Sequence, residues 1–183
     1  MKLNYLAVIC FVLLLVNCKE ENPIPKPKAL MRLEYPQGQL ETLKTDNFEF
    51  QYNELAKAKA NNEEAFTIEY PEMKGAIFIS YKKIDDNLNK LIRDAEKLSY
   101  EHASKGQIIP YPFVNPENKV YGALFEVQGD AASQSQFFVT DSTEHFLTGS
   151  VYFFTKPNYD SILPAAAYLQ NDVRIIMESL KWK

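Results

Sequence analysis

The chain has 183 residues and a formal net charge of −4, and 46% of its residues are hydrophobic. At this length a single domain can bury a substantial core without help from a cofactor. The mild acidity, with no block of Lys or Arg residues, argues against nucleic acid as a partner.

The first 17 residues have the pattern of a secretory signal peptide. Lys2 is followed by an apolar run over residues 6–16, and Cys18 comes two positions later. The run is about half the ~20 residues that a membrane-spanning helix needs, so we expect it to be cleaved rather than kept as an anchor. A Cys at the cleavage point resembles the lipobox of bacterial lipoproteins, in which that Cys is acylated, with palmitate among the lipids, and becomes the first mature residue. We therefore expect 1–17 to be a lipoprotein signal peptide and Cys18 the lipidation site; the alternative is a plain signal peptide with an incidental Cys.

Residues 18–30 are expected to tether the domain to the membrane. Alternate prolines over residues 23–27 favour an extended polyproline II conformation, which would hold the domain some ~30 Å from the lipid. Lys19 and the two glutamates after it resemble the surface-export signal of Bacteroidetes lipoproteins. A solvated charged linker explains the same residues equally well. Both the periplasmic face and the surface face of the outer membrane are therefore alternatives for the protein.

Residues 31–183 are expected to form one globular domain. The first half shows four segments in which apolar and polar side chains alternate as in a β-strand, at 31–35, 48–52, 66–70 and 76–83. Between them, residues 54–65 are rich in Ala, Lys, Asn and Glu, which predicts a short exposed helix or a loop.

A helix is predicted next, with Asp85 or Asp86 as its N-terminal cap and Gly106 as its stop. Its apolar stripe consists of Leu88, Leu91, Ile92, Ala95 and Leu98. Residues 108–114 contain two prolines, which predicts a strand at a sheet edge, where a missing N–H does no harm.

Three further strands are predicted at 120–127, 134–140 and 146–155, joined by short polar turns that imply antiparallel pairing. Phe137 and Val139 would point to one face and Phe138 to the other, which indicates a sheet covered on both sides. The last element is a helix from about Asp160 to Trp182, with Pro164 in its first turn and an apolar stripe of Ile162, Ala166, Leu169, Val173, Ile176 and Leu180.

These elements predict an α+β fold: a single antiparallel sheet of roughly six to eight strands flanked by helices. The order of the elements is similar to that of the PsbP-like type of fold, a likeness that implies no function.

The sequence offers no persuasive set of catalytic or metal-binding residues. His102 and His145 are the only histidines, and neither has further ligands at metal-site spacing. The segment 141–145 places Asp141, Ser142 and His145 together, but triad members converge from separate parts of a fold and the serine lacks a strained Gly-x-Ser-x-Gly elbow. We expect no enzyme activity, no cofactor, no metal and no small-molecule substrate.

Several segments together resemble one family. Residues 136–147 (QFFVTDSTEHFL) and residues 31–36 (MRLEYP) after the proline-rich tether carry the likeness, as do 75–81, 120–122, 157–161 and 178–182. In this order they resemble the gliding-motility lipoprotein GldD family of Bacteroidetes across nearly the whole mature chain.

The resemblance implies a cell-envelope lipoprotein that is needed for gliding motility and is tied to type IX protein secretion. It brings no catalytic residues. The expectation is thus a non-enzymatic protein, lipid-anchored at the outer membrane, that contacts other gliding and secretion proteins. The alternative is a surface lipoprotein that binds glycan or peptide through an aromatic face.

Overall fold

The computed structural model describes residues 35–36, 38–156 and 158–183, and only the backbone of His102 and Ala103. The signal peptide, Cys18 and the tether therefore lie outside the described residues. So does the strand predicted at 31–35, apart from Tyr35, which is not in a strand. The described residues belong to one compact unit, Arg32–Lys183.

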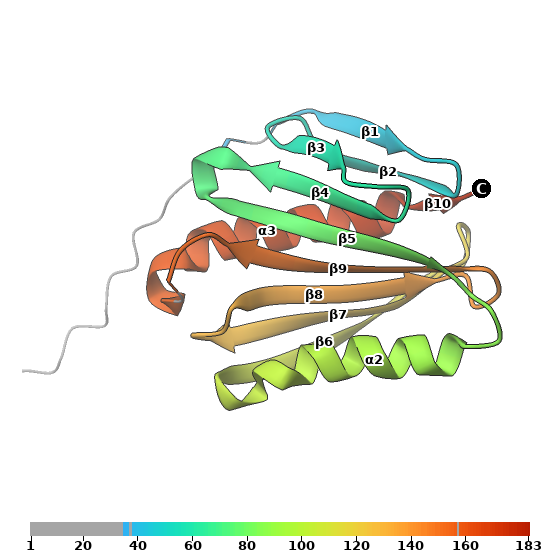
Figure 1. Cartoon of the computed structure of the whole chain (residues 1–183). Helices are drawn as coiled ribbons and strands as arrows, with labels where there is room; N and C mark the ends of the chain where they lie inside the picture. The colour runs from blue at the N-terminus through green and yellow to red at the C-terminus, as the bar shows by residue number, and fades with distance from the viewer. Residues whose placement is uncertain (1–34, 37, 157) are drawn as a thin grey trace, which may run out of the picture. The chain divides into compact units, whose positions relative to one another are not determined.

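The described part of the chain contains ten strands and two α-helices, with two short 3-10 turns (Figure 1). The strands are β1 (Leu40–Lys44), β2 (Phe48–Asn53), β3 (Lys57–Ala60), β4 (Ala65–Tyr70), β5 (Gly75–Lys83), β6 (Gly106–Asn115), β7 (Val120–Gly129), β8 (Ser133–Thr140), β9 (His145–Phe153) and β10 (Lys181–Trp182). The helices are α2 (Leu88–Tyr100) and α3 (Tyr159–Ser179), and the 3-10 turns are η1 (Pro71–Met73) and η2 (Glu101–Ser104). Neither helix is long and apolar enough to cross a membrane.

The strands form two antiparallel sheets, which confirms the α+β class. The main sheet has seven strands in the order β3-β4-β5-β9-β8-β7-β6, within the size expected for the predicted sheet. Three strands in the order β1-β2-β10 form a second sheet, the small sheet, whose strands are not paired with those of the main sheet. The proline-containing strand β6 lies at an edge of the main sheet, as predicted.

The larger core lies between the main sheet, α3 and the small sheet. The side chains of Phe48, Ile77, Leu147 and Leu169 are fully buried in it, and Phe137 and Val139 of β8 join them. Phe48 of β2 is stacked on Phe50 of the same strand at 5.8 Å and lies edge-on to Phe66 of β4 in the main sheet at 5.5 Å. The small sheet is thus held to the rest of the domain by aromatic packing.

A second, smaller core lies on the opposite face of the main sheet. Leu91 of α2 packs there on Phe125, Phe138 and Phe146, from β7, β8 and β9. Figure 1 shows α2 and α3 on opposite faces of the sheet. The prediction that Phe138 points away from Phe137 and that both faces are covered is confirmed.

The ends of α2 differ from the prediction. Its N-cap is Asn87, whose side chain accepts a hydrogen bond from the Asp85 backbone, while Asp86 has a left-handed backbone with φ of 48°. Neither predicted aspartate caps the helix, because Asp85 and Asp86 belong to the turn that leads from β5 and precede the N-cap position by two residues and one residue. The helix also ends at Tyr100, before η2, and Gly106 opens β6 rather than closing the helix.

Two further segments were assigned wrongly from the sequence. Residues 57–60, predicted as helix or loop, form β3, a fully exposed edge strand paired with β4. Its lysines keep the edge soluble, which is a common feature of edge strands. Trp182, predicted to end the last helix, instead lies in β10 and pairs with Phe48 of β2.

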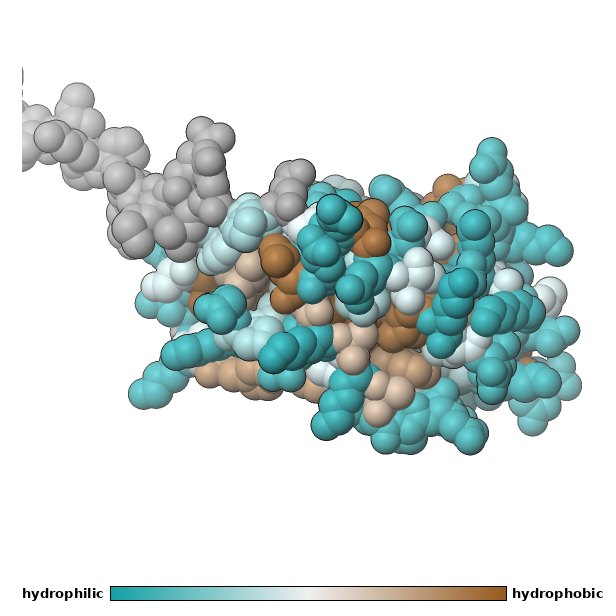
Figure 2. All heavy atoms as spheres, turned by 90° about the horizontal axis from the view of Figure 1, so that it is seen from above, coloured by the Kyte–Doolittle hydropathy of each residue, from teal (hydrophilic) through white to brown (hydrophobic). Residues whose placement is uncertain are grey.

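The last helix begins at Tyr159 and is capped by Asn158, whose side chain accepts a hydrogen bond from the Ser161 backbone. Because the helix begins at Tyr159, Pro164 lies in its second turn rather than in the predicted first turn. The predicted stripe is confirmed at Leu169, Val173 and Ile176, all fully buried. Figure 2 looks down on the side where β1 and β3 lie, and it shows hydrophilic side chains with hydrophobic ones between them.

Candidate functional site

The turn between β8 and β9 gathers the polar residues that the sequence singled out. Asp141 follows β8, and its Oδ1 accepts hydrogen bonds from the backbone N–H groups of Thr143, Glu144 and His145 at 3.0, 2.9 and 2.8 Å. The Thr143 hydroxyl donates to Oδ2 at 2.7 Å. Ser142 has a left-handed backbone with φ of 70°, which the dense bonding around it maintains. The Asp141 carboxylate is therefore the hub of the turn.

These hydrogen bonds control the charge of Asp141. Partial burial by itself would raise the pKa of the carboxyl, but the donors from His145, Thr143 and Glu144 outweigh it and lower the pKa from 3.8 to about 2. Hydrogen bonds to the ionised form stabilise that form. Asp141 is thus ionised at any physiological pH and is held as a structural anion.

His145 is fixed by aromatic neighbours. Its Nδ1 lies 2.8 Å from the hydroxyl of Tyr81, and its ring stacks on Trp182 with centroids 5.2 Å apart and planes 6° apart. The Trp182 indole donates in turn to the Lys119 carbonyl at 3.1 Å. These contacts join β5, β9 and β10 at one end of the domain, so His145 ties the small sheet to the main sheet.

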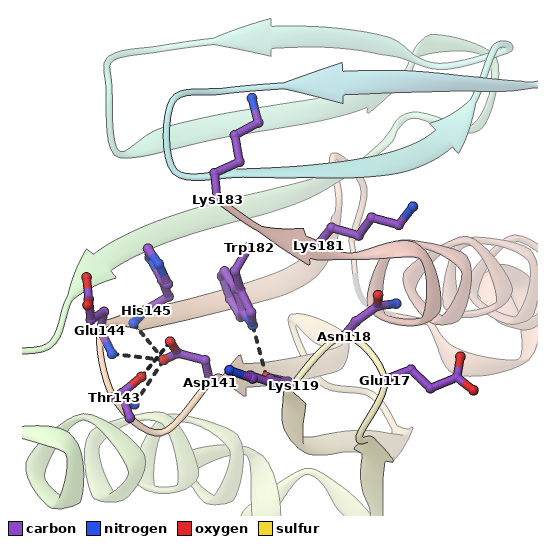
Figure 3. A pocket seen from close by; sticks show the side chains of 10 residues that line it. All are labelled: Glu117, Asn118, Lys119, Asp141, Thr143, Glu144, His145, Lys181, Trp182 and Lys183. Carbon is purple, nitrogen blue, oxygen red and sulfur yellow. Dashed lines mark hydrogen bonds between the residues drawn. The ribbon is translucent and has the colours of Figure 1, made fainter.

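A cavity of about 510 Å³ opens beside this cluster (Figure 3). Its lining consists of Glu117, Asn118, Lys119, Asp141, Thr143, Glu144, His145, Lys181, Trp182 and Lys183. Ser142 borders a different cavity, and Asp141 bonds the backbone of His145 rather than its ring. Asp141, Ser142 and His145 are therefore neighbours in the sequence but do not have the geometry of a Ser-His-Asp triad.

Within the residues that the structure describes, no group of three or more His, Cys, Asp or Glu side chains has the arrangement that a metal ion needs. The side chain of His102 lies outside that set, as does Cys18, the expected lipidation site.

The hydrogen bonds on Asp141 give a testable stability prediction. Because its pKa is lower in the folded chain than the usual 3.8, its contribution is present above that pH and is lost as pH falls toward about 2. Replacing Asp141→Ala should lower the free energy of unfolding at pH 7 by at most about 2 kcal/mol, since solvent screens part of the effect. Urea unfolding at pH 7 and at pH 2 measures it.

The matched control is Asp94→Ala, which removes the same charge from an exposed position on α2. We expect that variant to change the free energy of unfolding little at either pH. If the Asp141→Ala protein lost as much stability at pH 2 as at pH 7, the carboxylate would not be the anion that holds the turn.

A second candidate surface lies on the part of the main sheet that α2 does not cover. Phe78 of β5 is 40% exposed and Phe154, just after β9, is 59% exposed. Phe78 meets Tyr152 edge-on at 5.8 Å and Phe154 edge-on at 6.5 Å. We call Phe78, Tyr152 and Phe154 the aromatic face.

Lysines flank the aromatic face. Lys59 of β3 lies opposite Thr67 of β4, and Thr67 lies opposite Phe78 of β5. In the same way Lys57 lies opposite Glu69 of β4, and the row continues through Ala76 of β5 to Tyr152 of β9. Residues directly opposite one another in a sheet share a face. The aromatic face thus has exposed lysines along its β3 side.

Sequence reasoning noted the aromatic content but did not single out these residues. The available signal was the phase of β5: Ile77 and Ile79 point into the core, so Phe78 between them must point out. The sequence pattern does not reveal which part of the sheet α2 covers, because that depends on long-range packing.

A family model described as "Gliding motility lipoprotein GldD" matches residues 20–182 of this chain. No curated protein matches the chain.

Proposed function

The chain belongs to the gliding motility lipoprotein GldD family, and we propose that it serves gliding as a non-enzymatic protein that contacts other proteins of the cell envelope. Membership implies a lipid-anchored envelope protein with a role in gliding motility. The finer proposal is that Cys18 carries the lipid, that the membrane is the outer membrane, and that the protein is tied to type IX secretion.

The lipid anchor is supported by the sequence around Cys18. The family match begins at residue 20, two positions after this cysteine, and the preceding apolar run is too short to span a bilayer. Residues 1–17 would be removed and residues 18–30 would tether the domain 31–183 to the membrane. Acyl chains bind a membrane by burying their CH₂ groups, which makes the cysteine the essential attachment point.

Action by contact is supported by the chemistry of the described surface. The polar residues of the β8–β9 turn are engaged in holding that turn and His145 in place. The aromatic face, in contrast, exposes apolar rings on a rigid sheet beside lysines. Exposed aromatic clusters mark interaction sites, and Tyr and Phe are enriched in protein interfaces. We assign the aromatic face to a protein partner with an acidic rim.

The same aromatic face supports the alternative, a surface lipoprotein that binds glycan or peptide. Rings on a sheet can stack on sugars, and Phe78 and Phe154 are exposed enough to do so. Their edge-on packing offers no flat pair of rings, however, because Phe78 and Phe154 are at 90° to one another. Retention on peptidoglycan or on a glycan array would favour this alternative.

Deleting the gene tests the proposal. We expect the deletion strain to lose colony spreading and the secretion of type IX cargo, and both to return when the wild-type chain is supplied in trans. Secretion is assayed by mass spectrometry of the culture medium. Normal spreading and normal secretion in the deletion strain would refute the proposed role; normal secretion with lost spreading would restrict it to gliding.

A further inference from the structure

A cavity of about 430 Å³ lies where α3 meets the small sheet. It shares no lining residue with the cavity beside the β8–β9 turn. Tyr35, Leu40 and Ile175 form much of its wall, and Asn53, Tyr168 and Asp172 supply polar groups to it. Two of these polar side chains are almost completely buried: Asn53 is 4% exposed and Asp172 is 3% exposed. A nearly buried carboxylate among the residues that line a cavity is the unusual feature.

The hydrogen bonds to Asp172 all reach one of its oxygens. The hydroxyl of Tyr70 donates to Oδ2 at 2.8 Å, and Nδ2 of Asn53 approaches the same atom at 3.3 Å. Among the residues that the structure describes, no donor is bonded to Oδ1 and no Lys or Arg is paired with the carboxylate. Asp172 lines the cavity, and both of the described hydrogen bonds to it use the same oxygen, Oδ2.

The neighbours of Asp172 are held in place by the rest of the fold. Asn53 donates to the hydroxyl of Tyr168 at 2.7 Å and accepts from the Leu55 backbone at 3.0 Å. Tyr168 donates to the Pro36 carbonyl at 2.7 Å. The cavity is therefore a preformed arrangement that joins α3, β2 and the segment that enters the domain.

The arrangement is costly if it serves stability alone. Burial raises the pKa of Asp172, with the hydrogen bonds from Tyr70 and Asn53 acting against it. A buried carboxylate with two neutral donors and no cation is less stable than a paired one. An amide at position 172 could accept the same hydrogen bond from Tyr70 without that cost.

The walls indicate what would complete the site. The rings of Tyr35 and Tyr168 lie 5.3 Å apart at 55°, and Tyr70 is edge-on to Tyr168 at 6.4 Å. Aromatic rings attract cations through their faces, and a carboxylate attracts them by charge and hydrogen bonding. Apolar walls at Leu40 and Ile175 suit an alkyl stem.

We propose that this cavity binds a protonated amine or guanidinium on an alkyl stem, as on a lysine or arginine side chain, with Asp172 as the counter-ion and the tyrosines as the surrounding rings. The group could come from another molecule or from the chain itself. Arg32 is the arginine or lysine nearest to Tyr35 in the sequence and lies outside the described residues.

Calorimetric titration of the mature chain with Nα-acetyl-lysine amide and Nα-acetyl-arginine amide tests the proposal, with Nα-acetyl-norleucine amide as the uncharged analogue. We expect the cationic amides to bind at least about tenfold more tightly than the norleucine amide, because only they can pair with the carboxylate. Asp172→Asn should abolish the preference. Glu178→Gln, the same change at an exposed position on α3, should not.

Thermal unfolding shows whether Asp172→Asn remains folded, and we expect it to be as stable as the wild type or more so. If the wild type binds none of the amides but Arg32→Gln binds the cationic ones, the chain's own arginine is the occupant. Equal affinity for the norleucine amide, or no binding by either protein, would overturn the proposal. The norleucine comparison holds whether or not the Asp172 variant folds.

Discussion

The Cys18→Ala protein should be missing from the membrane fraction of the cells that make it, and it should fail to restore colony spreading to a deletion strain. Neither helix of the described residues can cross a membrane, and the apolar run over residues 6–16 is too short to do so. We propose that attachment depends instead on acyl chains at this cysteine. Membrane fractionation and labelling with a fatty acid would measure the loss.

The control for this substitution is Cys10→Ala. Cys10 lies in the apolar run that we expect to be removed with the signal peptide, so that variant should be processed and labelled as the wild type is. Continued incorporation of the labelled fatty acid into the Cys18→Ala protein would show that the anchor lies elsewhere in the chain.

Phe138→Asp should unfold the domain. Phe138 is 7% exposed beneath α2 and stacks on Phe146 with ring centroids 5.7 Å apart. Loss of a buried phenylalanine costs about 3–5 kcal/mol, and an unpaired buried carboxylate adds to it. The sum is comparable to the whole stability of a typical domain, about 5–15 kcal/mol. Circular dichroism and urea unfolding of the purified chain would measure it.

Phe78→Asp is the matched control, since it makes the same change on the same face of the sheet. Phe78 is 40% exposed and lies outside the area that α2 covers, so its substitution should change the free energy of unfolding by less than about 1 kcal/mol. Similar losses for the two variants would contradict the division of this face into a covered and an open part.

The sequence predicted those parts of the fold that local patterns determine. Alternation located β2, β4 and β5, and the opposite directions of Phe137 and Phe138 correctly indicated cores on both faces. The stripe of α3 was visible because leucine, valine and isoleucine recur at helical spacing. Pairing of β7 with β8 and of β8 with β9 followed from short polar turns, which leave little choice of partner.

What the sequence missed depends on distant partners. β3 has only alanines and lysines and is a strand because its backbone pairs with β4. β10 has two residues and pairs with β2, more than 120 positions earlier in the chain. The Asp172 cavity also depends on distant partners. In the sequence Asp172 has the pattern of an exposed helix residue. Asn53 and Tyr70 come within hydrogen-bonding distance of it only in the folded domain.

We propose that this protein acts in gliding through contact and that the aromatic face makes the contact. The most direct test is colony spreading of a deletion strain whose only copy carries Phe78→Asp. We expect spreading to be lost while the abundance, membrane attachment and folding of the variant stay at wild-type levels, because a charge among exposed rings disrupts docking without disturbing the core. Wild-type spreading from this strain would contradict the claim and place the contact elsewhere.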